Sequence, residues 1–185
     1  MQPLTSISFI ILLIYSNSCS SNGLQGVALE KGSTLTGKVI SIIDGDTYDV
    51  LLQGNKTIRV RMEGIDAPER GMPFYQKSKK YLSDLCFGKQ VSIQITGIDH
   101  HERVLAYTFL VDGREVSQEM IRAGLAWHFK KYNSDATLSG IEIEARKSKV
   151  GLWIQDSPMA PWENRRLHRS GIPTRDSFNI EEGQR

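Results

Sequence analysis

The stretch of residues 42–69 constrains the fold most, because it alternates β-branched runs with short turn signals. Asp44-Gly45-Asp46 lies between two such runs and predicts a tight hairpin, since glycine accepts a positive φ and aspartate tolerates turn geometry. Gly54-Asn55 predicts the next turn. We therefore expect a meander of three strands at residues 35–43, 47–52 and 56–62.

Acidic and basic side chains gather near the ends of these strands. Asp46, Asp66 and Glu69 would repel one another if the fold brought them together, so such a fold should supply a cation. Oxygen ligands without Cys or His select Ca²⁺ or Mg²⁺ over zinc or copper. Arg59 and Arg61 share one face of the third strand, and a guanidinium beside a carboxylate-bound cation suits a phosphate diester. Spacing alone leaves a second interpretation open, in which these residues form surface hairpins with solvated charges.

Four ordered segments of the chain resemble the staphylococcal nuclease (thermonuclease) family. They are residues 43–47 (IDGDT), 60–69 (VRMEGIDAPE), 103–107 (RVLAY) and 124–127 (GLAW). Their order and spacing hold from about residue 35 to residue 153. The resemblance implies a single-domain, calcium-dependent nuclease, which we expect to be a monomer. It also implies an α+β fold, mainly a five-stranded OB-type barrel with about three helices packed on it.

The remaining elements fit such a barrel. We expect helices at residues 73–87, 116–123 and 138–149, and further strands at residues 90–96 and 104–111. Two of the strand connections are hairpin-short, which favours a closed barrel over a parallel sheet. We expect the nuclease domain at residues 35–155. Residues 156–185 contain three prolines and a charged run, and they predict an extended basic tail.

The metal ligands follow from the resemblance alone. It implies that one Ca²⁺ ion is held by the carboxylates of Asp46 and Asp66 and by the main-chain carbonyl of Ala67. Asp44 resembles the outer carboxylate that orders metal-bound water. Mg²⁺ could occupy the same oxygens without supporting turnover.

The resemblance also assigns catalytic roles. Glu69 resembles the residue that positions or deprotonates the attacking water, and Pro68 stiffens its link to the metal ligand. Arg61 and Arg103 would grip the scissile phosphate from two sides and stabilise the charge of the transition state. The implied reaction is endonucleolytic hydrolysis of DNA and RNA that leaves 3′-phosphates, with single strands preferred. The alternative is a catalytically inactive OB-type module that binds nucleic acid or a peptide.

Substrate contacts outside the catalytic set are expected from His101, Lys130 and Tyr132. The family commonly has Tyr-Gly before the second arginine, whereas His101-Glu102 precede Arg103 here. His101 could partly substitute as a stacking or phosphate-binding group, or be a loop residue with no task. The net charge is only +2 over 185 residues, so any basic surface for nucleic acid must be local.

The N-terminus predicts export. Residues 1–22 carry no charged side chain, and the apolar run at residues 7–15 suits the core of a signal peptide. The run ends in Ser-Cys like a bacterial lipoprotein signal, so we expect residues 1–19 to be the signal and Cys19 to be lipidated at a membrane. Cleavage with release to the periplasm or the medium is the alternative, and the mass of the mature N-terminus distinguishes the two. Residues 20–34, rich in Ser and Gly, then form a flexible tether.

Cys86 is the only other cysteine, and it lies on the apolar stripe of the helix expected at residues 73–87. We interpret it as a small core residue. A disulfide with Cys19 is disfavoured, because Cys19 belongs to a segment that is removed or modified.

Overall fold

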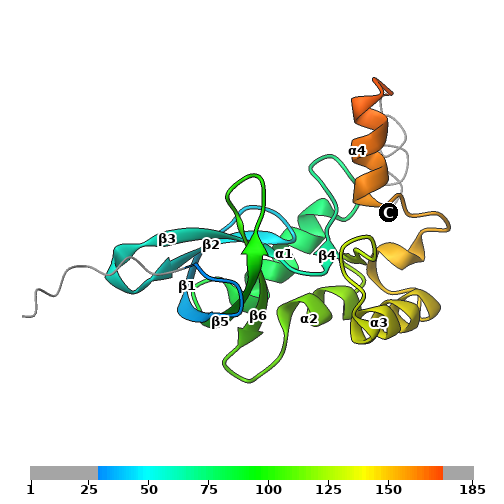
Figure 1. Cartoon of the computed structure of the whole chain (residues 1–185). Coiled ribbons are helices and arrows are strands. Elements are labelled where there is room, and N and C mark those ends of the chain that lie inside the picture. The colour runs from blue at the N-terminus through cyan, green and yellow to red at the C-terminus, as the bar shows by residue number, and fades with distance from the viewer. Residues whose placement is uncertain (1–28, 173–185) are drawn as a thin grey trace, which may run out of the picture.

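The computed structural model describes residues 29–172, which form a five-stranded closed barrel with helices around it (Figure 1). The barrel strands are β1 (Thr34–Ile42), β2 (Thr47–Leu52), β3 (Thr57–Met62), β5 (Gln90–Ile98) and β6 (Val104–Leu110). Their order around the barrel is β1-β2-β3-β6-β5. The β3–β6 pair is parallel and the other pairs are antiparallel. The predicted α+β class and the OB-type barrel are confirmed.

Three helices lie where the sequence predicts them. They are α1 (Tyr75–Cys86), α2 (Val116–Arg122) and α3 (Ala136–Lys147). Helix α1 begins at Tyr75 rather than at Pro73, because Phe74 before it adopts a left-handed conformation with φ 65°. Two short 3₁₀ turns, Gln53–Asn55 and Gly151–Ile154, complete this part of the chain. Within the described residues, no helix is both long and apolar enough to cross a membrane.

The prediction of an extended tail from Asp156 is wrong for the described residues, because Pro161–Arg169 forms a fourth helix, α4. Proline is favoured at the first helical position, where no hydrogen-bonded N–H is needed. Acidic Glu163 lies in the first turn and basic residues lie in the last turn, which matches the helix dipole. Figure 1 shows α4, in orange, standing beyond the barrel on the side of the molecule that carries α3.

The barrel interior is filled by alternate residues of its strands. Val39, Val50, Val60 and Ile93 are completely buried, as the period of two in a strand requires. Cys86 is also fully buried, which confirms it as a core residue. Cys19, the predicted signal and most of the tether lie outside the described residues.

A small second sheet, which the sequence did not predict, places one of the acidic residues. Strand β4 (Ile65–Asp66) pairs antiparallel with β7 (Trp127–His128), and Asp66 lies opposite Trp127. This pairing ties the segment that follows β3 to the segment that follows α2. Asp66 is therefore held by backbone hydrogen bonding at the edge of the barrel.

Gly124 and Gly151 bring two backbone segments into close contact. Both have positive φ, and a Cβ on Gly151 would overlap the carbonyl oxygen of Gly124. We expect Gly151→Ala to lower the free energy of unfolding by about 3 kcal/mol, from left-handed strain plus a forced backbone shift. Urea denaturation measures it. Gly54→Ala is the matched control, because Gly54 also has positive φ but no atom lies within 4 Å of its added Cβ. An equal loss in both variants would contradict the contact argument.

Candidate active site

A large cleft, with a volume of about 1670 Å³, runs along the side of the barrel toward α4. Its walls come from the β1–β2 turn, the segment after β3, the β5–β6 turn, the segment after β7, and α4. Every residue predicted for the site lines this cleft: Asp44, Asp46, Arg61, Asp66, Ala67, Glu69, His101, Arg103, Lys130 and Tyr132. Basic side chains outnumber acidic ones along it.

The β1–β2 turn delivers the first two carboxylates. Asp44 Oδ1 accepts a hydrogen bond from the backbone N–H of Asp46 at 3.1 Å, and Asp46 Oδ2 accepts one from the backbone N–H of Ala67 at 2.7 Å. The turn was predicted, but the reason given for Gly45 was wrong, because Gly45 is not among the residues with positive φ. A Cβ there would instead overlap Ser78 Oγ on α1, so glycine is needed for close packing.

Arg61 lies between the carboxylates of Asp46 and Asp66. Its Nη1 donates to the carbonyl oxygens of Met62 at 2.9 Å and Ile65 at 2.8 Å. Its Nη2 lies 3.1 Å from Asp66 Oδ1 and 3.3 Å from Asp46 Oδ2. The carboxylates of Asp46, in the β1–β2 turn, and of Asp66, on β4, therefore converge on one nitrogen atom. Their side chains are only 8% and 2% exposed.

Burial of these acids shifts two of their pKa values upward. Burial, together with the neighbouring charge of Asp46, raises the pKa of Asp44 to about 7. Burial raises the pKa of Asp66 to about 6, although Arg165 and Arg61 act in the opposite direction. Burial removes the water that stabilises a charged carboxylate. A further cation nearby and the carboxylates of Asp44 and Asp66 would therefore stabilise one another.

Glu69 lies beside Asp66 and shares a partner with it. Arg165 Nη1 lies 2.5 Å from Glu69 Oε1, and Arg165 Nη2 lies 2.6 Å from Asp66 Oδ2. Arg165 belongs to α4, a part of the chain for which the sequence predicted only an extended basic tail. Its place in the acidic cluster of Asp46, Asp66 and Glu69 was missed. The signal that could have revealed it is Pro161 at a helix start, which puts Arg165 on a defined helix face.

Arg103 lies on the same cleft but is held by a different acid. Its Nε and Nη2 lie 2.8 Å and 2.7 Å from Asp99 Oδ2, while Asp99 Oδ1 accepts the backbone N–H groups of His101 and Arg103. These hydrogen bonds outweigh partial burial and lower the pKa of Asp99. Asp99, rather than the adjacent Glu102, therefore orients Arg103.

Aromatic side chains form one wall of the cleft. The ring of Phe129 meets Tyr132 edge-on, with centroids 4.9 Å apart, and stacks parallel on Trp162 of α4 at 5.1 Å and 6°. Tyr132 is 68% exposed and lies near the ammonium of Lys131. Trp127 is buried against Trp153, so it packs in the core and is not part of this wall.

Lys130 is not a freely available phosphate ligand in this structure. Its Nζ lies 2.7 Å from Glu142 Oε2 on α3, and the Glu142 side chain is only 2% exposed. A buried carboxylate needs such a partner, so a strand in the cleft would have to compete for this ammonium.

The groups that could hold a metal ion are all oxygen donors. In the part of the chain that the structure describes, no three His, Cys, Asp or Glu side chains converge as a ready-made metal site. The two buried carboxylates of Asp46 and Asp66 do converge on one cation, the guanidinium of Arg61. Carboxylate oxygens suit a hard divalent ion.

Comparison with known proteins gives a consistent result. Residues 59–155 match the family model described as staphylococcal nuclease homologue. An uncharacterized endonuclease of Haemophilus influenzae is 40% identical over 134 residues, which are 72% of this chain and 75% of that protein. An uncharacterized endonuclease of Escherichia coli is 37% identical over 126 residues, 68% of this chain and 82% of that protein. Micrococcal nuclease of Shigella flexneri is 32% identical over 154 residues, 78% of this chain and 88% of that protein.

Proposed function

The chain belongs to the staphylococcal nuclease family, and from that premise we propose that it is a calcium-dependent endonuclease that hydrolyses single-stranded DNA and RNA to 3′-phosphate ends. The observation that carries the proposal is the convergence of Asp46 and Asp66 on one nitrogen of Arg61, inside a cleft that Glu69 and Arg103 also line. A module that only bound nucleic acid would have no use for buried carboxylates in a phosphate groove.

The site residues divide into those that hold the cation and those that take part in the reaction. We assign the cation to Asp46, Asp66 and the carbonyl of Ala67. When bound, a divalent ion supplies Lewis-acid charge at a non-bridging phosphate oxygen. Glu69, with its side chain 39% exposed at the cleft, accepts the proton of the attacking water.

Two guanidiniums hold the phosphate. Arg61 approaches from the β3 side, where two backbone carbonyls fix its orientation. Arg103 approaches from the β5–β6 turn, where Asp99 fixes it. Their fork geometry suits two phosphate oxygens at once and stabilises the extra negative charge of the transition state.

The cleft supports a preference for single strands. The aromatic wall of Phe129, Tyr132 and Trp162 offers ring faces and edges, and base stacking on such side chains tolerates any sequence. Lys131 and Arg70 add positive charge along the same cleft for the backbone of the strand.

Product analysis tests this proposal. We expect the full chain to cut denatured DNA and RNA with calcium, to lose that activity with a chelator, and to regain it when calcium is restored. Mass spectrometry of the fragments should show 3′-phosphates and 5′-hydroxyls, and the matching duplex should be cut more slowly. Cleavage that a chelator does not change would mean that the proposed site is wrong. Products with 5′-phosphates would contradict the assigned direction of attack.

A further inference from the structure

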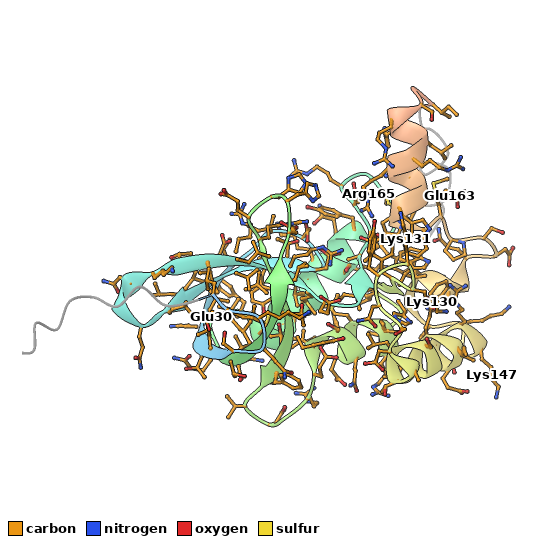
Figure 2. All side chains as sticks on the ribbon, in the orientation of Figure 1. Glu30, Lys130, Lys131, Lys147, Glu163 and Arg165 are labelled. Carbon is orange, nitrogen blue, oxygen red and sulfur yellow. The ribbon has the colours of Figure 1, made fainter. Side chains whose placement is uncertain are left out.

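Helix α4 presents an aromatic and basic face to the cleft. Trp162, Arg165, Arg166 and Arg169 have the spacing of one helix face, and all four line the cleft. Figure 2 shows Arg165 on the side of α4 that faces the barrel, with Lys131 below it and Glu163 on the other side of the helix. This face lies outside residues 59–155, the span that matches the family model.

Arg165 occupies oxygens that the proposed cation needs. Its Nη2 lies 2.6 Å from Asp66 Oδ2, its Nη1 lies 3.3 Å from Asp66 Oδ1, and Nη1 also contacts Glu69. With Arg61 on Oδ1, both oxygens of Asp66 have guanidinium partners. The Asp66 side chain is only 2% exposed, so a further ligand has little open surface to approach.

We propose that Arg165 is an exchangeable cation of the active site: it holds Asp66 and Glu69 until a divalent ion replaces it, and the released guanidinium then faces the phosphates of the strand. The inference rests on the proposed function, because it takes Asp66 as a metal ligand. Two cations cannot both occupy Asp66 Oδ2, and their like charges repel at that distance. The affinity for metal is therefore set in part by α4.

The base of α4 allows this exchange without loss of the helix. Pro161 and Asn164 are buried, whereas Arg165, Arg166 and Arg169 are partly or largely exposed. Trp162 also rests on Phe129 through a parallel ring contact. An arginine side chain has several rotatable bonds, so its guanidinium can leave the carboxylates while the helix stays anchored.

Replacing Arg165 by glutamine should tighten calcium binding. Isothermal titration calorimetry on the full chain, with calcium alone and no nucleic acid, reports this directly. We expect the Kd for calcium to fall about tenfold or more, a coupling of the usual size between competing ligands. The titration is done at about pH 8.5, far above the usual carboxyl range, so that loss of Arg165 does not leave Asp66 protonated.

Two further variants make the test specific. Arg165→Lys keeps the charge but loses the two-pronged contact, so its Kd should lie between those of the wild type and Arg165→Gln. Arg166→Gln is the matched control, because Arg166 is the next residue on α4 and pairs with Glu163 rather than with the acidic cluster. We expect Arg166→Gln to leave the Kd within about twofold, the scale of an exposed ion pair.

The outcomes separate the two proposals. If the wild type binds calcium and Arg165→Gln binds it equally or more weakly, the exchange is refuted while the proposed function stands. If none of the variants binds calcium, the metal assignment itself fails. A similar fall in the calcium Kd of both Arg165→Gln and Arg166→Gln would show only a general effect of positive charge on α4, and it would also refute the exchange.

Discussion

Replacing Glu69 by glutamine should lower kcat at least about 100-fold, the lower limit for removal of a well-placed general base. Glutamine keeps the size and the polar oxygen of glutamate but cannot take a proton from water. The fold should survive, because the Glu69 side chain is 39% exposed and pairs with Arg165, whereas the contact with the adjacent turn is made by the backbone N–H of Glu69, which donates to Met72 Sδ and is kept in the variant. The measurement is kcat on denatured DNA at saturating calcium, together with the melting temperature.

The ion pair between Glu69 and Arg165 makes one control necessary. Glutamine also weakens the hold on Arg165 Nη1, so a fall in rate could come from a misplaced guanidinium. The double variant Glu69→Gln/Arg165→Gln removes that possibility, and we expect it to stay as slow as Glu69→Gln alone. Recovery in the double variant would show that Glu69 acts only by restraining Arg165. Glu163→Gln, an exposed carboxylate on α4, should keep the wild-type rate.

The barrel could be predicted because its strands carry their own signals. Apolar residues alternate with polar ones in β3 and over much of β5, as expected for strands with one buried and one exposed face, and the β1–β2 turn is marked by Asp44-Gly45-Asp46. Strands β4 and β7 were missed because two residues are too few to show any period. They form only through tertiary contact between distant segments, which local patterns do not record.

The acidic cluster was predicted to lie together, and the structure places Asp46, Asp66 and Glu69 on one cleft. What local pattern could not supply was the identity of their partners. Arg165 is 99 residues from Asp66 in the sequence, and its contact depends on where the segment between α3 and α4 leads the chain. Asp99 as the partner of Arg103 was also missed, although an aspartate four residues before an arginine in a turn is a local signal.

Arg59 and Arg61 show how position along one strand separates a surface charge from a site residue. Both lie on β3 two residues apart, so their side chains leave the same face. Arg59 lies opposite Asp49 on β2 and pairs with it at the surface, with 51% of its side chain exposed. Arg61 lies opposite Thr47, next to the β1–β2 turn, and its side chain is only 13% exposed. The two arginines therefore form a natural matched pair for substitution.

Arg61→Lys should lower kcat/KM about 100- to 1000-fold, the cost of removing one preorganised donor to transition-state charge. One ammonium cannot replace two Nη atoms that contact the carbonyls of Met62 and Ile65 on one side and the carboxylates of Asp46 and Asp66 on the other. Arg59→Lys should change kcat/KM by less than about twofold, because an exposed pair contributes little. Both rates are measured on denatured DNA with calcium, and melting temperatures separate lost stability from lost catalysis. Equal losses in the two variants would mean that Arg61 contributes only general positive charge, and its assignment to the scissile phosphate would have to be abandoned.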